Sequence, residues 1–307
     1  MAASGSHSCI PSTARMAMDD LAERIKASID NRNVDPWFPE LTADLAAREW
    51  GRLQCDPGLT PDSYCTERVL SRSLSTPREV ITYLKTCAST CATAPTISIE
   101  ALTEKCAAKY QRQGVNFYSP HEILHTTVLA CIEDALAVIN KVPSLMRTVS
   151  GLARSLHVLK PVDEYHDVSF SEPDIPFSIF VSVPEKRVAN DALRVAEAIV
   201  HETMHLQLTL IDKTNCLILS RSKKYYSPWR REYRDAEGIL HALYVFGVIE
   251  CFFERLALTN EHLANAEDFN WNRRSEIRRQ FENSSYLQLC SDLSKVGSCL
   301  VRKLTRA

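Results

Sequence analysis

The chain is predicted to fold mainly as an α-helical bundle with a small β element. Its 307 residues include only eight glycines, under half of the usual share of ~7%, which disfavours Gly-rich phosphate loops and hairpin-rich β folds. Helix signals, namely apolar positions at helical spacing behind capping residues and prolines, also follow one another along most of the chain.

The chain before residue 161 divides into a tail and a helical region. Residues 1–18 are small and polar and are expected to form a flexible N-terminal tail. Residues 19–160 are expected to form a helical N-terminal region. Its expected helices are Asp19–Ile29, Pro39–Cys55, Arg78–Ala92, Ser98–Gln111, Pro120–Lys141 and Ser144–Leu159.

The pattern changes near residue 160. Phe177–Val183 alternates in the manner of a strand, and Asp167–Phe170 is its expected partner. Helices then return at Asn190–Asp212 and Asp235–Leu258. Residues 161–307 are therefore expected to form a second region, or to complete one composite domain with the region before it.

Composition excludes several classes of partner. The 36 Lys and Arg residues nearly balance the 38 Asp and Glu residues, for a net charge of −2, which argues against nucleic acid or an anionic membrane as the main partner. No uninterrupted apolar run approaches the ~20 residues of a transmembrane helix. The 11 cysteines are odd in number and scattered, and the N-terminus lacks an apolar signal segment. A reduced, cytoplasmic protein is expected.

The motif HExxH occurs twice, and the first copy is interpreted as a chance match. It spans His121–His125, directly after Ser119 and Pro120. Ser119 is placed as a helix N-cap and Glu122 as the matching acid of a capping box. Glu122 thus has a structural role, at a helix start where a metal site would be exposed.

The second copy, His201–His205, is the predicted metal site. It lies in the middle of an apolar, buried helix, where His201 and His205 are one turn apart on the same face. Polar groups buried there need partners, because leaving them unpaired costs several kcal/mol. A metal ion supplies such a partner, so residues 161–307 are expected to form a metal-binding catalytic region.

The third ligand is expected from the next helix, and two residues compete for the role. Glu237 and His241 share one face of Asp235–Leu258. With Glu237, the site becomes that of a zinc peptidase in which Glu202 is the general base. With His241, three neutral ligands leave open positions that suit an anionic chelating co-substrate and dioxygen. Gly238 is expected where the two metal-bearing helices approach closely.

Three arginines precede the candidate third ligand. The segment Tyr225–Arg234 ends in a basic and aromatic stretch that includes Arg230 and Arg234. Arginine is suited to bidentate capture of a carboxylate. An oxygenase that binds 2-oxoglutarate needs such a group, whereas a peptidase does not. The alternative is that these arginines pair with neighbouring acids.

Several segments of the second region match the motifs of a known family. They are the strand region Ser169–Ser182, the motif His201–His205, the segment Ser227–Arg230, and Glu237–His241 running into Tyr244–Phe246. With them, residues 165–255 resemble the HExxH-type peptide β-hydroxylases. The resemblance implies an iron(II)- and 2-oxoglutarate-dependent dioxygenase that uses O2 to hydroxylate the β-carbon of a residue in a ribosomally synthesised precursor peptide.

The resemblance also implies residue roles. The implied iron ligands are His201, His205 and His241. Arg230 or Arg234 is the implied ligand of the 2-oxoglutarate carboxylate, and Glu202 becomes a supporting group rather than a hydrolytic base. The metal would then be held by two helices, as in zincin peptidases, and not by a double-stranded β-helix. Two other hypotheses stay open: a zinc metallopeptidase that uses Glu202 and Glu237, and an inactive peptide-binding scaffold.

Overall fold

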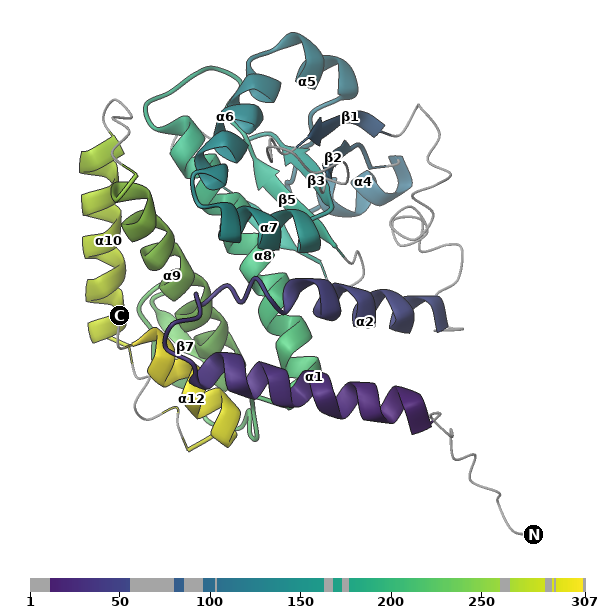
Figure 1. The fold of residues 1–307 in the computed structure, drawn as a ribbon. Helices are drawn as coiled ribbons and strands as arrows, with labels where there is room; N and C mark the ends of the chain where they lie inside the picture. Colours follow the sequence, from purple (N-terminus) through teal and green to yellow (C-terminus); the bar gives the residue numbers. More distant parts are fainter. Residues whose placement is uncertain are drawn as a thin grey trace.

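The protein is mainly helical, as predicted, in the computed structural model shown in Figure 1. The structure describes residues 12–55, 80–85, 96–102, 104–162, 168–172, 177–259, 266–284, 289 and 291–305. The described helices are α1 (Ser12–Asp30), α2 (Thr42–Cys55), α4 (Glu104–Gln111), α5 (Pro120–His125), α6 (Val128–Asn140), α7 (Pro143–Leu152), α8 (Asp191–Asn215), α9 (Ala236–Ala257), α10 (Ala266–Glu282) and α12 (Lys295–Leu304).

A five-stranded mixed sheet is the second part of the fold, in the order β1–β2–β3–β5–β4. The three inner strands are parallel to one another, whereas β1 and β4 are edge strands antiparallel to their neighbours. Strands β6 and β7 form a separate hairpin. The strands are β1 (Val80–Lys85), β2 (Thr96–Glu100), β3 (Ser155–Leu159), β4 (Ser169–Ser171), β5 (Ser178–Ser182), β6 (Tyr225–Ser227) and β7 (Glu232–Arg234).

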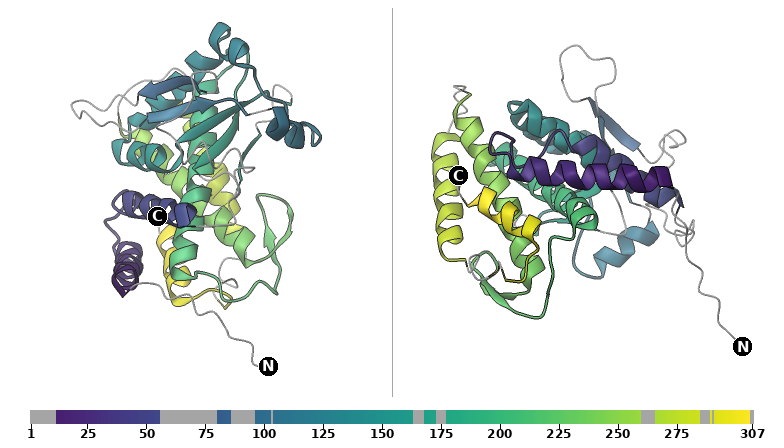
Figure 2. Two further views of the ribbon diagram at one scale, coloured as in Figure 1. Left: turned by 90° about the vertical axis from the view of Figure 1, so that its right-hand side faces the viewer. Right: turned by 60° about the horizontal axis from the view of Figure 1, so that its bottom comes forward.

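Helices cover both faces of this sheet. Ile179 and Val181 of β5 belong to the main core with α6, α7 and α8, while Phe180 between them packs with Tyr110 of α4 on the other face. All residues of β3 and β5 are buried, as expected for parallel strands covered on both sides. Helix α8 runs from the sheet to the lower helices (Figure 1), where α1 lies beside α12 (Figure 2).

Three of the expected helices are wrong in part. Arg78–Ala92 contains strand β1, and its residues 86–92 lie outside the described residues. Ser98–Gln111 and Ser144–Leu159 contain strands β2 and β3 next to the helices α4 and α7. Polar and apolar residues alternate in β2 and β3, which is the pattern of a strand, but each segment has only five residues and lies next to a helix. The parallel pairing of β2 with β3 and of β3 with β5 shows that both are strands. The β element is therefore larger than predicted, and the sheet combines strands from both sides of residue 160.

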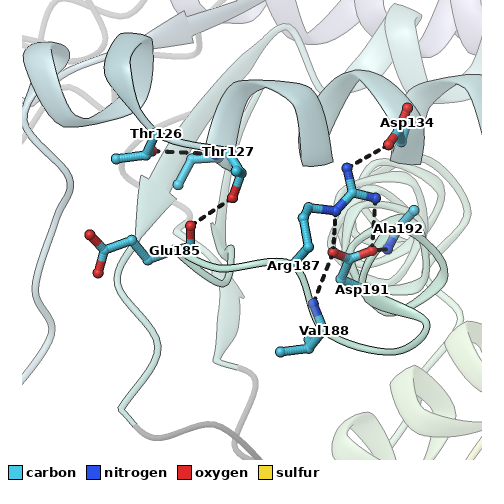
Figure 3. Close-up of polar contacts among 9 residues, drawn as sticks. Thr126, Thr127, Asp134, Glu185, Arg187, Val188, Asp191 and Ala192 are labelled. Carbon is cyan, nitrogen blue, oxygen red and sulfur yellow. Dashed lines mark hydrogen bonds and ion pairs between the residues drawn. The ribbon is translucent and has the colours of Figure 1, made fainter.

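The other expected elements are confirmed with shifted ends. The strand at residues 177–183 and its antiparallel partner are β5 and β4. Helix α1 begins at Ser12, inside the expected tail, and residues 1–11 lie outside the described residues. The expected helix Pro120–Lys141 is broken between α5 and α6. At this break the Thr127 hydroxyl donates to the carbonyl oxygen of Glu185 (2.6 Å), in the segment that leads into α8 (Figure 3).

An ion-pair cluster holds the start of α8 against α6 (Figure 3). Arg187 donates to both carboxylate oxygens of Asp191 (2.5 and 3.1 Å) and to Asp134 of α6 (2.7 Å). Asp191 is 4% exposed and also accepts from the backbone N–H groups of Val188 and Ala192. A buried carboxylate is stable there because each of its oxygens has a charged or backbone donor.

A buried polar network joins α8 to α9. The Tyr244 hydroxyl of α9 donates to Gln207 Oε1 of α8 (2.6 Å), and Gln207 Nε2 donates to the carbonyl oxygen of Trp37 (2.8 Å). Gln207 and Tyr244 are fully buried. Since a buried amide is stable only when its polar atoms are paired, the network defines how α8 and α9 lie against each other.

Helix α9 is an interior helix of the globular fold. By length and composition it is apolar enough to cross a membrane, with a mean hydropathy of 1.5, but 67% of that stretch is buried inside the protein. It packs against α8, α10 and α12. This arrangement is consistent with a water-soluble protein.

We expect Tyr244→Phe to lower the free energy of unfolding by about 1–3 kcal/mol, because the buried Gln207 Oε1 loses its donor. Urea denaturation followed by circular dichroism measures the change. Tyr233→Phe is the matched control. Tyr233 is 70% exposed, and removing its hydroxyl should change the free energy of unfolding by less than ~0.5 kcal/mol. Equal effects of the two substitutions would contradict a stabilising role for the network.

Candidate metal centre

The structure brings together the three histidines predicted as metal ligands. On α8, the Nε2 atoms of His201 and His205 lie 3.1 Å apart. From α9, His241 places its Nδ1 atom 2.9 Å from Nδ1 of His205. The first pair follows from helical spacing alone, whereas the contact with His241 depends on how α9 packs against α8.

These separations are close to those between ligands of one metal ion. Two nitrogens bound at about 2.1 Å with a right angle between them lie ~3.0 Å apart. As the rings lie, however, His205 faces His201 with Nε2 and His241 with Nδ1. Within the described part of the chain, no group of three or more His, Cys, Asp or Glu side chains is placed to hold an ion as it stands. A rotamer change of one ring is needed before all three nitrogens converge.

Burial keeps the three imidazoles neutral. The pKa of His201 is lowered to about 4, mainly by desolvation and in addition by the positive charges of Arg273 and Arg230. Desolvation also holds the pKa of His205 well below its ordinary value and lowers that of His241. Neutral imidazoles with free lone pairs are the form that binds a divalent transition metal. The donor set therefore fits such an ion.

Glu202 of the motif points to the sheet rather than along the line of histidines. Its Oε1 atom accepts from the Ser169 hydroxyl of strand β4 (2.7 Å) and lies 3.9 Å from Nε2 of His201. Ser171 of the same strand also hydrogen-bonds Glu202. Desolvation raises the pKa of Glu202 to about 7, although both serines and the charge of Arg230 oppose this rise.

The two candidates for the third ligand differ in what they face. His241 faces His205, as described above. The side chain of Glu237 is 44% exposed, and its Oε2 atom accepts from Arg221 Nε (2.7 Å). The arrangement thus favours His241. The expectation for Gly238 is wrong: a Cβ atom there would lie 3.1 Å from Arg234 Nε rather than against α8. The glycine therefore leaves room for the Arg234 side chain.

The two predicted arginines of the hairpin interact with different groups. Arg230 lies in the turn between β6 and β7, and its charge lowers the pKa values of His201, His205 and Glu202. Arg234 at the end of β7 pairs with Glu232 (3.0 Å). Of the two predicted arginines, Arg230 is therefore the one whose charge reaches the histidines.

Sequence reasoning missed a second arginine beside the histidines, Arg273. Arg273 of α10 donates from Nε and Nη2 to Glu197 of α8 (2.8 and 2.6 Å), one turn before His201. Its guanidinium lies 5.5 Å from the ring centroid of Phe246. Residue 273 stands 27 positions beyond Phe246, where the last motif ends, and nothing in the pattern around it sets it apart from the other arginines of α10.

Aromatic rings form one wall of the site. Phe246 of α9 packs edge-on against His201, with ring centroids 5.4 Å apart. Trp229, from the same turn as Arg230, stacks on Phe246 at 5.5 Å with nearly parallel rings. Phe281 of α10 packs against the edge of Trp229. This wall shields one side of His201 from water and limits how its ring can turn.

The first HExxH copy has the structural role predicted for it. Ser119 accepts from the backbone N–H of Glu122, and the Glu122 carboxylate accepts from the backbone N–H of Ser119, which completes the capping box of α5. Lys160 donates to Glu122 as well (2.6 Å), and the pKa of Glu122 falls to about 2 mainly because of this bond.

A cavity of about 720 Å³ lies away from the histidines. Its walls come from the segment after α1 and from the C-terminal parts of α9 and α12, including Arg255 and Lys303. His241 stands near the N-terminal end of α9, so the candidate metal centre is a separate place. The four cysteines with described side chains, Cys131, Cys216, Cys251 and Cys299, are all free thiols.

Comparison with known proteins adds no family to these observations. No protein-family model matches the chain, and no curated protein sequence matches it. The function is therefore inferred from the residues and their geometry.

The raised pKa of Glu202 predicts how the metal-free protein responds to pH. Folding raises this pKa from 4.5 to about 7, so the folded state binds the proton of Glu202 more tightly than the unfolded state does. This bound proton stabilises the fold at low pH, and the stabilisation is lost as the pH rises from 4.5 to 7. Glu202→Gln keeps the shape of the side chain and carries no charge, so its stability should not fall in this way. We expect the free energy of unfolding of Glu202→Gln to exceed that of the wild type by an amount that grows with pH, to on the order of 3 kcal/mol above pH 7.

Urea unfolding of the metal-free wild type and of Glu202→Gln at several pH values between 4 and 8 measures this difference. The burial of the histidines acts in the opposite direction in both proteins and cancels in the comparison. A difference that does not change with pH would show that the carboxyl group is not desolvated in the folded protein.

Proposed function

We propose that this protein is an iron(II)- and 2-oxoglutarate-dependent oxygenase that hydroxylates the β-carbon of a residue in a ribosomally synthesised peptide. The observation that carries the proposal is the meeting of three neutral histidines, His201, His205 and His241, from two helices, with the Arg230 guanidinium nearby. Such a donor set suits an ion with open positions for an anionic co-substrate. The resemblance of residues 165–255 to the HExxH-type peptide β-hydroxylases supports the same function.

Each nearby group has a role in this proposal. His201, His205 and His241 hold the iron. Arg230 binds the far carboxylate of 2-oxoglutarate and compensates its charge. Phe246 and Trp229 keep water from the ligand side of the site. When bound, the iron and 2-oxoglutarate with O2 supply the oxidising chemistry, and the protein supplies orientation and a dry pocket.

Glu202 acts as a positioning residue in this reaction. Its carboxyl group is held by Ser169 and Ser171 and contacts the edge of the His201 ring. At 3.9 Å from Nε2 of His201, the carboxyl group acts on this ring through its charge and by limiting how the ring can turn. The precursor peptide is the proposed partner, and the cytoplasm is the proposed location because the chemistry uses a reduced metal.

A zinc metallopeptidase is the second candidate, and one observation favours it. The pKa of Glu202 at about 7 is well matched to a general base that acts near neutral pH. In that function Glu237 would have to leave Arg221 and replace His241 at the metal.

Metal binding distinguishes the two functions. Anaerobic addition of iron(II) and 2-oxoglutarate should produce a weak visible charge-transfer band in the wild type and in Glu237→Ala. His241→Ala should lose the band, because the third ligand is gone. Absorption spectroscopy with an iron titration measures both. If only zinc supports activity, and Glu237→Ala abolishes it while His241→Ala does not, the peptidase is correct. Failure of the wild type to bind any metal would favour an inactive scaffold.

Binding of 2-oxoglutarate is expected to depend on Arg230 and not on Arg234. Removing a guanidinium that pairs with a carboxylate costs about 1.5–3 kcal/mol, or roughly 10- to 100-fold in affinity. Arg230→Ala should therefore weaken 2-oxoglutarate binding to the iron-loaded protein by this factor. Arg234→Ala is the matched control from the same hairpin and should stay within about threefold of the wild type. Isothermal titration calorimetry gives the affinities, and the opposite ranking would assign the carboxylate to Arg234.

A further inference from the structure

The strand beside the metal centre is an edge strand of the five-stranded sheet. Strand β4 (Ser169–Ser171) follows β5 at the end of the strand order, and its residues are half-buried. Among the residues that the structure describes, no other strand pairs with its outer side. An edge strand presents unpaired backbone N–H and C=O groups, to which an extended chain can add as a further strand.

The hydrogen bonds to β5 show which backbone groups of β4 face outward. Ser182 N donates to the carbonyl oxygen of Val168 (2.9 Å), directly before β4. Since the backbone groups of successive residues in a strand point to opposite sides, the N–H and C=O groups of Ser169 point away from β5. The same holds for Ser171, two residues on. The outer edge of β4 therefore offers two donors and two acceptors, about 6.7 Å apart along the strand.

The side chains of the same two serines connect this edge to the metal centre. Ser169 and Ser171 hydrogen-bond Glu202 of the HExxH motif. Phe170 between them points to the other face of the sheet, where it stacks on Phe180 with ring centroids 4.5 Å apart. Strand β4 is thus fixed on both faces, while its outward backbone groups lie next to the residue that contacts His201.

We propose that the outer edge of β4 binds an extended peptide segment as an added strand, through the backbone N–H and C=O groups of Ser169 and Ser171, and so presents the peptide to the histidine site. This inference rests on the proposed function in that the substrate is a peptide. Backbone pairing of this kind requires an extended chain and is largely independent of the peptide's side chains. The bound region of the substrate is therefore unfolded, and a helix or a small molecule does not fit this edge.

Ser171→Pro removes the proposed donor without removing a bond to β5. The proline lacks the outward N–H group, and proline is tolerated on edge strands when its nitrogen faces away from the sheet. Ser171→Ala is the matched control, because it also removes the hydroxyl that contacts Glu202 but keeps the N–H group. Circular dichroism and thermal unfolding show whether both variants fold.

The probe is a displayed library of random 12-residue peptides, selected against the metal-free wild-type protein. Enriched peptides should bind the wild type and Ser171→Ala with similar affinity and bind Ser171→Pro at least tenfold more weakly. N-methylation of the peptide backbone, one position at a time, should weaken binding at every second residue. This second measurement needs no protein variant, so it tests the proposal even if Ser171→Pro fails to fold.

Several outcomes would overturn the proposal. They are a selection without any enriched peptide, equal binding to Ser171→Pro and Ser171→Ala, and N-methylation effects without a two-residue period. Because the selection uses no metal, its result is independent of the iron titration. Absence of the charge-transfer band in the wild type, together with peptide binding, would reject the oxygenase and keep the docking edge. A band in the wild type without peptide binding would keep the oxygenase and reject the edge.

Discussion

The candidate site depends on the packing of α8 against α9 more than on any single side chain. Gln207 on α8 and Tyr244 on α9 are buried and hydrogen-bonded to each other, two and three residues beyond His205 and His241. A buried amide and hydroxyl lose much of their stability when they part. One relative position of the two helices is therefore favoured, and it places His241 against His205.

Burial then sets the chemistry of the groups that this packing brings together. Desolvation lowers the pKa values of His201, His205 and His241 and raises that of Glu202. Both changes reduce the charge of the site, because a low-dielectric surrounding penalises every charged form. The guanidinium groups of Arg230 and Arg273 lie nearby, and that of Arg273 is paired with Glu197 and Glu276. The result is three neutral imidazoles beside the Arg230 guanidinium, an arrangement that suits the proposed anionic co-substrate.

The sheet shows where helical spacing predicts the wrong element. The segments of β1, β2 and β3 are short and are predicted as parts of longer helices, whereas β5 is predicted as a strand. In β3 every residue is buried because the strand has neighbours on both sides and helices on both faces. Ser155 and His157 of β3 alternate with Leu156 and Val158, which is the period of a strand. Both polar side chains are nevertheless buried, so this strand has no solvent-facing side. The edge strand β4, whose serines hold Glu202, gains its importance from its place in this sheet.

Local properties of the chain were determined by the sequence alone. The helical character, the capping box of Ser119 and Glu122, and the pairing of His201 with His205 depend on residues within one turn of each other. Only the tertiary structure decided that His241 rather than Glu237 faces His205, that Arg230 rather than Arg234 acts on the site, and that Glu202 contacts β4. Those choices join segments far apart in the chain. They follow from which packing buries the apolar faces and still pairs the buried polar groups, and this balance is a property of the whole fold.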